Sequence, residues 1–230
     1  MISVCRREEK YPLDVTYAYE YRSVFSAMLM TDSFSQRGSY MVRSLYFDTP
    51  EDRDYFQKIN EQNVRRKIRL RIYSPTDQRA KLEMKQKENI FQRKRSLTIS
   101  KAEALELIGG NYSVLLRYSE DFAAELYTLM AGELYRPKSI VEYQRYAFMA
   151  RENNIRLTFD GDIRATETDF NLFSEKLPLT PVFPPDKVIF DVKYDKFILE
   201  YISNLISRVD ARSISSSKYC LSRSVTYPFQ

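Results

Sequence analysis

The sequence contains no histidine, only two cysteines and only five glycines in 230 residues. The lack of histidine excludes Ser-His-Asp and Cys-His triads, histidine general bases and zinc sites that use histidine. Cys5 and Cys220 are too few for a disulfide framework or a zinc cluster, and we read them as two reduced thiols. Any metal would therefore bind to carboxylates, which suits Mg²⁺ or Mn²⁺.

Long apolar segments are also missing. No run approaches 18 apolar residues, so no segment is expected to span a membrane, and any membrane partner would be a separate chain. The first ten residues, MISVCRREEK, lack the apolar core of a signal peptide. We therefore expect a cytoplasmic protein.

The composition is that of an ordinary globular protein, with 43% hydrophobic and 29% charged residues. Because the chain shows no linker, internal repeat or low-complexity tract, we expect residues 1–230 to form a single domain. The net charge of +5 is small. It indicates an anionic partner only if the basic residues gather in one place.

Strand patterns dominate the chain, and helical patterns lie between them. The segment Thr49-Pro50-Glu51-Asp52 is read as a helix start with proline at the first helical position. The expected strands are 2–10, 40–48, 64–73, 79–87, 91–100, 138–150, 154–160 and 187–194, and the expected helices are 14–30, 51–60, 101–108, 119–131 and 196–209.

Cations and apolar residues alternate along the segment 64–73. Successive side chains of a strand point to opposite faces, so all the cations at odd positions share one face. Spaced about 6.6–7 Å apart along the strand, they repel one another unless an anion compensates. The cations are Arg65, Lys67, Arg69 and Arg71, and the opposite face carries Ile68, Leu70 and Ile72.

Charged residues alternate with apolar ones in four further strands. This pattern fits an antiparallel sheet with one solvated face. It also fits a barrel whose polar faces point inward and whose apolar faces are covered by helices, which would be a cationic tunnel for a polyanion. The same-face charges are Lys81, Glu83, Lys85 and Lys87; Arg156 and Asp160; Asp191 and Lys193; and Glu8 and Lys10.

Eight short motifs occur in a specific order along nearly the whole chain. They are KYPL at 10–13, RSLYFDT at 43–49, RRKIRLRIY at 65–73, KLEMKQK at 81–87, VEYQRYAF at 141–148, IRLTFD at 155–160, FDVKYD at 190–195 and SKY at 217–219.

In these motifs the chain resembles the VTC domain, the polyphosphate polymerase domain of the vacuolar transporter chaperone complex, in a bacterial stand-alone form. That domain belongs to the CYTH superfamily of triphosphate tunnel metalloenzymes. The resemblance implies an α+β fold, in which eight antiparallel strands form a tunnel with helices packed outside. It also implies transfer of the γ-phosphate of ATP to polyphosphate or pyrophosphate, with Mn²⁺ or Mg²⁺ as cofactor.

The resemblance assigns phosphate-binding roles to residues at matching positions, and the strand pattern adds Lys67, Lys193 and Arg43 as substrate-binding candidates. Lys67 and Arg43 equally fit plain surface positions. The residues implied to contact the reacting phosphates are Arg69, Arg71, Lys85, Arg145, Arg156 and Lys218, and those implied to bind substrate are Lys10, Tyr143 and Ser217.

Asp191 stands where the family usually has the metal-binding glutamate, and it is shorter by one methylene. We expect it to bind the metal, although an ion pair with Lys193 or a tunnel arginine would also explain it. Glu83, Glu8 and Asp160 are further candidates for the metal or for ion pairs.

Three other functions remain open from the sequence. A triphosphate hydrolase of the same superfamily would use water as the nucleophile, and a non-catalytic polyphosphate-binding module would show no metal dependence. Nucleic-acid binding is the general interpretation of a basic chain with 14% aromatic residues. Cations that face inward on consecutive strands argue against it, so we expect no nucleic-acid partner.

Overall fold

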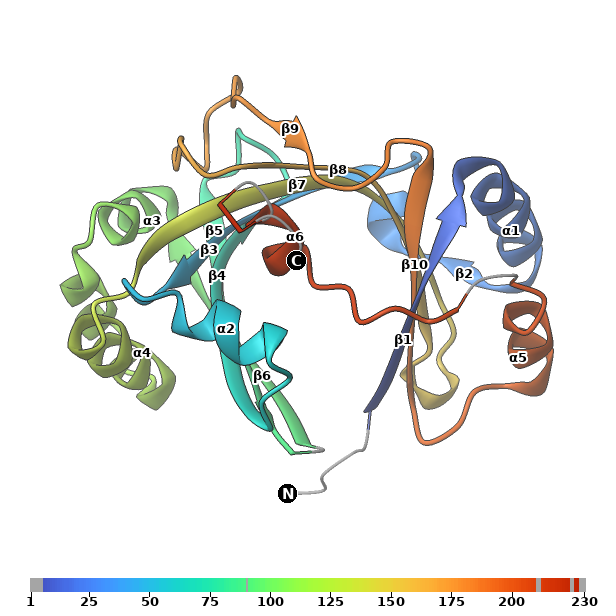
Figure 1. The fold of residues 1–230 in the computed structure, drawn as a ribbon, viewed down its shortest axis with the longest axis horizontal. Coiled ribbons are helices and arrows are strands. Elements are labelled where there is room, and N and C mark those ends of the chain that lie inside the picture. Colours follow the sequence, from blue (N-terminus) through green and yellow to red (C-terminus); the bar gives the residue numbers. More distant parts are fainter. Residues whose placement is uncertain (1–5, 90, 210–211, 224–225, 228–230) are drawn as a thin grey trace. The chain divides into compact units, whose positions relative to one another are not determined.

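The computed structural model describes residues 6–89, 91–209, 212–223 and 226–227. A ten-stranded sheet with antiparallel pairing dominates it (Figure 1), in the order β1-β10-β8-β7-β3-β4-β5-β6. The two further strands, β2 and β9, pair with β7 and β8 and are two residues long. The expected α+β class is confirmed, and the sheet has ten strands rather than eight because of these two short additions.

All eight expected strands are present, and two of them continue several residues beyond their expected ends. The first strand continues to Asp14 through Pro12, which an edge strand tolerates because it needs ladder hydrogen bonds on one side only; expected residues 2–5 lie outside the described residues. The strand expected at 154–160 continues through Gly161 to Thr166. Glycine suits this position because a Cβ atom there would lie only 3.1 Å from Val188 Cγ1. The strands are β1 (Arg6–Asp14), β2 (Met30–Thr31), β3 (Tyr40–Asp48), β4 (Val64–Ile72), β5 (Arg79–Glu88), β6 (Phe91–Ser100), β7 (Arg136–Met149), β8 (Arg156–Thr166), β9 (Thr180–Pro181) and β10 (Lys187–Asp195).

All five expected helices are present, and one short helix was not expected. The helix expected at 196–209 covers only seven residues, because Lys196 has a left-handed backbone and Leu199 is extended. No helix in the described part of the chain has both the length and the apolar character needed to cross a bilayer. The helices are α1 (Val15–Met28), α2 (Arg53–Ile59), α3 (Lys101–Ile108), α4 (Asp121–Gly132), α5 (Glu200–Ile206) and the unexpected α6 (Lys218–Ser222), with 3₁₀ turns η1 (Ser33–Ser35), η2 (Tyr112–Arg117) and η3 (Glu152–Asn154).

The chain divides into two compact units. The first unit comprises Met1–Met41, Tyr143–Arg164 and Pro181–Ser217. The second unit comprises Val42–Glu142, Ala165–Thr180 and Lys218–Gln230. Each is described below by itself.

In the first unit, α1 and α5 cover the apolar face of the strands and lie next to each other (Figure 1). Phe25 of α1 lies in the centre of an aromatic cluster, with its ring 5.9 Å from that of Phe190 and 6.3 Å from that of Phe159. Removing this much aromatic surface from water is the main stabilising contribution in the unit. Burial of this aromatic cluster also determines which face of the strands packs against the helices and which face points away from them.

In the second unit, α3 and α4 cover the apolar face of β4, β5 and β6 (Figure 1). The core side chains Ile68, Leu70 and Leu82 are fully buried, as the alternation predicts. The capping box of α3, in which Ser100 and Glu103 exchange hydrogen bonds, starts that helix directly after β6. The charged residues of the same strands therefore lie on the opposite face, away from α3 and α4.

The carboxylate of Asp48 connects the end of β3 to α2. It is fully buried and accepts hydrogen bonds from the backbone amides of Thr49, Asp54 and Tyr55, at 2.7, 2.9 and 2.9 Å. The expected proline at the first helical position is wrong, because α2 begins at Arg53, after a left-handed residue at position 52. Asp48 satisfies the free amides at the start of the helix instead.

Asp54, in the first turn of α2, is a buried carboxyl group with a raised pKa. It is fully buried and accepts hydrogen bonds from the hydroxyl of Tyr135 at 2.9 and 3.1 Å. Burial raises its pKa to about 7 and the nearby charge of Asp48 adds to this, against the opposing effects of Tyr135, Arg66 and Arg53. The folded state therefore holds this proton more tightly than the unfolded chain.

We expect the stability contribution of Asp54 to fall as the pH rises from about 4 to about 7, because the folded protein keeps a proton that the unfolded chain has lost. Asp54→Asn removes this ionisation, so the variant should gain stability relative to the wild type between pH 5 and pH 8, by roughly 1–3 kcal/mol. Urea unfolding at both pH values measures the difference. The exposed substitution Asp121→Asn on α4 is the control, and an Asp54→Asn difference that does not change with pH would contradict the assignment.

Candidate functional site

The polar face of the second unit carries the predicted arginine pair. Arg69 and Arg71 on β4 lie directly opposite Tyr46 and Ser44 on β3. The guanidinium of Arg69 donates to the hydroxyl of Tyr46 at 3.2 Å, and Arg71 Nε donates to Ser44 Oγ at 3.3 Å. The side chains of Arg69 and Arg71 are only 13% and 10% exposed, so they are not an ordinary solvated face.

Glu83 on β5 is the counter-charge of this arginine pair. Its Oε2 accepts from Arg69 Nε at 2.8 Å and lies 3.7 Å from Arg71 Nη1, while its Oε1 pairs with Lys94 on β6. Burial alone would raise the pKa of Glu83, but Arg69, Arg71 and Lys94 outweigh it and lower the pKa to about 2. Both carboxylate oxygens are thus engaged by cations, so the ion-pair alternative predicted for Glu83 is present.

Three lysines lie directly opposite one another across β4, β5 and β6. The register pairs Lys67 with Lys85, and Lys85 with Lys94. Like charges placed directly opposite on adjacent strands are destabilising. This lysine row lies two residues along the strands from Arg69 and Glu83, and therefore on the same face. It continues the cationic face that the arginine pair begins.

Lys94 is a candidate site residue that the sequence did not single out. The run Arg93-Lys94-Arg95 has no apolar residue that would show which face each cation occupies. In the structure Lys94 shares the face of Lys85, while Arg95 pairs with Glu125 on α4 at the opposite face. The face of Lys94 could have been inferred from the tight β5–β6 hairpin. This hairpin pairs Glu88 with Phe91 and so fixes the register of β6 against β5.

Arg43 lies on the other face of β3 from the arginine pair. Its register partner is Ile72, and it is 3% exposed. Its guanidinium donates to the carboxylate of Glu142 at 2.7 Å and to the carbonyl oxygens of Leu172 and Ser174 at 2.9 and 2.6 Å. These contacts hold the loop after β8, so we no longer propose Arg43 as a substrate contact.

The polar face of the first unit carries Arg145 and Arg156, and both have carboxylate partners. Arg145 donates to both oxygens of Asp160, at 2.6 and 2.8 Å. Burial alone would lower the pKa of Arg145, but Asp160 raises it well above its ordinary value, so the guanidinium stays charged. Arg156 donates to Asp32 at 2.9 Å. Tyr143, also predicted, is buried with its ring 5.2 Å from the guanidinium carbon of Arg145.

The same face brings together Lys10, Glu8, Asp191 and Lys193. On adjacent strands, Lys10 lies opposite Asp191 and Glu8 lies opposite Lys193. Lys10 Nζ is 2.6 Å from Glu8 Oε1, and Lys193 Nζ is 3.5 Å from the same oxygen while also pairing with Asp191 Oδ2. The expected alternative for Asp191, an ion pair with Lys193, is therefore present.

Asp191 still has one carboxylate oxygen suited to a metal ion. It is 3% exposed, and its Oδ1 is buried without a hydrogen-bond partner. Within the described ranges, no three acidic or cysteine side chains gather into a metal-ligand cluster. Mg²⁺ and Mn²⁺ need only one or two carboxylates when phosphate oxygens supply other ligands, so Asp191 fits such an ion.

The remaining predicted residues, Ser217 and Lys218, lie at the start of α6. Ser217 is buried and Lys218 is half-buried. The division between the two units falls between them. Apart from Ser217, Lys218 and Arg43, the predicted site residues therefore form two groups, one on the polar face of each unit.

The fold and these two faces define an α+β protein with an antiparallel sheet whose polar side is rich in arginine and lysine. The sequence profile of the VTC domain matches residues 5–227, and the chain belongs to the VTC domain family. The resemblance inferred from the motifs is confirmed. A comparison with curated proteins gives no match.

Several solved structures are similar to this chain. A Bacillus halodurans protein proposed to be an adenylate cyclase is 11% identical, with 93% of each chain covered and a TM-score of 0.52, so it shares the fold. A Pyrococcus horikoshii protein is 11% identical over 96% of this chain and 98% of its own, with a TM-score of 0.48. A conserved hypothetical protein from Pyrococcus furiosus is 11% identical over 89% of this chain and 87% of its own, with a TM-score of 0.43.

Removing the charge of Glu83 should destabilise the second unit, because three cations lose their common partner. We expect Glu83→Gln to lower the free energy of unfolding by about 3 kcal/mol. Added inorganic tripolyphosphate should raise the unfolding temperature of this variant more than that of the wild type, since the anion replaces the lost charge.

Thermal unfolding with and without tripolyphosphate measures both effects. Glu125→Gln is the matched control, because Glu125 pairs with Arg95 on the opposite face. Equal gains for Glu83→Gln and the wild type would show that the anion binds elsewhere.

Proposed function

We propose that this protein is an ATP-dependent polyphosphate polymerase, which transfers the γ-phosphate of ATP to a growing polyphosphate chain. The observation that carries the proposal is the lysine row of Lys67, Lys85 and Lys94 beside the largely buried Arg69 and Arg71. A string of phosphates matches several cations in a row better than a single phosphate does.

Charge balance supports a polyanionic ligand. On the polar face of the second unit, Glu83 engages Arg69, Arg71 and Lys94. That carboxylate has one negative charge, so the face keeps a net positive charge. Preorganised cations of this kind stabilise the charge that develops on phosphoryl oxygens during transfer, and they need little rearrangement to do so.

We also propose that both units act as one domain, in the tunnel that family membership implies, and that their polar faces serve one reaction. In this view Lys10, Arg145 and Arg156 bind phosphates on the first unit, and the arginine pair binds phosphates on the second. A divalent metal on Asp191 would help to neutralise phosphate oxygens. The ligands would be ATP and polyphosphate or pyrophosphate, in the cytoplasm, and no nucleic acid is involved.

A non-catalytic polyphosphate-binding module is the second candidate. It is favoured by the ion pair between Lys193 and Asp191, in which a lysine engages one oxygen of the candidate metal ligand. Such a module would use the same cations and would need no metal.

Purified protein with ATP and Mn²⁺ should form long polyphosphate. Arg69→Ala and Lys85→Ala should each lower the rate by roughly 100-fold or more, because each removes a preorganised charge at the phosphates. Electrophoresis of the product and a phosphate-release assay measure chain growth and hydrolysis separately.

Arg93→Ala is the matched control, because Arg93 is exposed and lies on β6 beside Lys94 but on the opposite face. Free phosphate as the only product would favour the triphosphate hydrolase. Tight polyphosphate binding without turnover in Mn²⁺ or Mg²⁺ would favour the binding module, and no binding at all would overturn the proposal.

A further inference from the structure

Helix α6 lies over the polar face of the second unit through Tyr219. The ring of Tyr219 stacks on that of Tyr46 on β3, with centroids 5.0 Å apart and an interplanar angle of 24°. The hydroxyl of Tyr46 in turn accepts from Arg69 at 3.2 Å. Tyr219 therefore connects the helix that begins with Lys218 to the arginine pair.

The hydroxyl of Tyr219 is fixed by a carboxylate that cannot move freely. It donates to Asp48 Oδ2 at 2.7 Å, in an environment where Tyr219 is 1% exposed. Asp48 is held by the backbone amide of Thr49 and by two backbone amides at the start of α2, those of Asp54 and Tyr55. Burial and the charge of Asp48 raise the pKa of Tyr219 well above its ordinary value, so the hydroxyl stays protonated as a donor.

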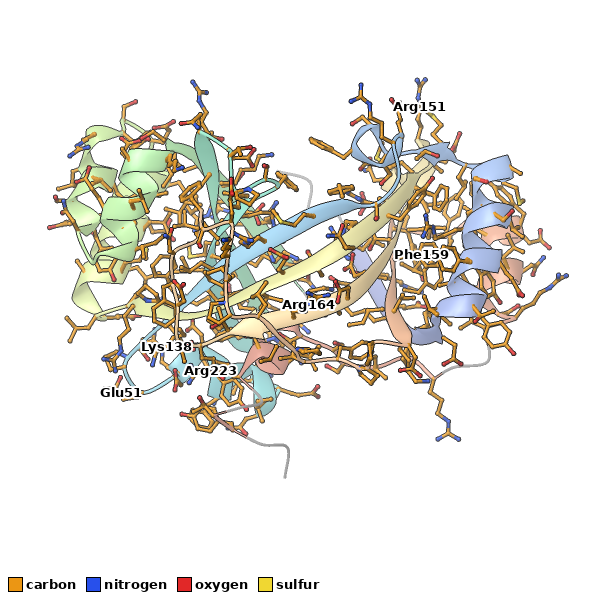
Figure 2. All side chains as sticks on the ribbon, turned by 90° about the horizontal axis from the view of Figure 1, so that it is seen from above. Glu51, Lys138, Arg151, Phe159, Arg164 and Arg223 are labelled. Carbon is orange, nitrogen blue, oxygen red and sulfur yellow. The ribbon has the colours of Figure 1, made fainter. Side chains whose placement is uncertain are left out.

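The far end of α6 has anchors of its own. Ser222 and Ser139 on β7 share a hydrogen bond of 2.7 Å. Arg223 donates to Asp52 at 2.8 Å and lies 2.9 Å from Glu167. Figure 2 shows Arg223 close to Lys138, whose carbonyl oxygen it also contacts at 3.4 Å. Loss of the Tyr219 hydroxyl therefore loosens only the beginning of α6.

We propose that Tyr219 is a positioning residue, which acts through its hydrogen bond to Asp48. It sets the start of α6 so that Lys218 is held beside Arg69 and Arg71 for contact with phosphate. This role rests on the proposed function, because it needs a phosphate ligand on the polar face. Tyr219 itself touches no reacting atom in this proposal, and its whole effect passes through Lys218.

The test is a double-mutant cycle with Tyr219→Phe and Lys218→Ala. Tyr219→Phe keeps the ring and its stacking and removes only the hydroxyl. It should weaken polyphosphate binding and raise the KM for ATP by about tenfold, the effect of one hydrogen bond to a charged group. In the Lys218→Ala background the same change should have almost no further effect, because non-additivity shows that the two residues act together.

Tyr118→Phe is the matched control, because Tyr118 also donates to a carboxylate, that of Glu103, at 2.7 Å. It lies between η2 and α4, in contact with the apolar core, and should leave binding and KM unchanged. Binding to polyphosphate is measured by calorimetry, well below the lowest unfolding temperature of the set.

Each outcome decides between the two proposals. Equal effects of Tyr219→Phe with and without Lys218 would show a general structural role and overturn this inference, as would unchanged binding in Tyr219→Phe or in Lys218→Ala. If one of these outcomes is found but Arg69→Ala still loses binding, only the role of Tyr219 fails and the proposed function stands. If the wild type neither bound polyphosphate nor used ATP, the proposed function would fail, and the role of Tyr219 with it.

Discussion

Mutual repulsion of like charges is the constraint on which the second unit depends. Arg69, Arg71 and Lys94 meet at one buried carboxylate, Glu83. Without that carboxylate the two largely buried arginines would lie close together in a poorly solvated place, where their repulsion is strong, and Lys94 would lose its partner. The first unit solves the same problem with separate pairs, Arg145 with Asp160 and Arg156 with Asp32. The polar faces are thus charged but partly compensated.

The apolar faces make this arrangement of cations possible. In both units the helices cover one face of the strands, and the aromatic and aliphatic side chains there are almost fully buried. A shift of one residue in register would exchange the two faces and bury the cations among apolar side chains. The hydrophobic cores therefore hold the charged side chains on the opposite face against their own repulsion.

Strand-forming composition lets the sequence predict β3 and β6 with their observed bounds, and alternation along β4 and β5 places Arg69, Arg71 and Lys85 on one face. The prediction fails where alternation is absent. Both faces of β3 are buried, so the pattern could not show that Arg43 lies on the apolar side. Helix α6 has five residues, too few for a helical period, and it is held by tertiary contacts from Asp48 and β7.

The bond between Tyr219 and Asp48 joins positions 171 residues apart. Contacts between positions so far apart require loop closure, which costs entropy and slows folding. During synthesis, β3 and α2 emerge long before their partner helix, and two segments of the first unit, Tyr143–Arg164 and Pro181–Ser217, are translated in between. The second unit can therefore complete its fold only after α6 has been synthesised, which follows synthesis of the last segment of the first unit.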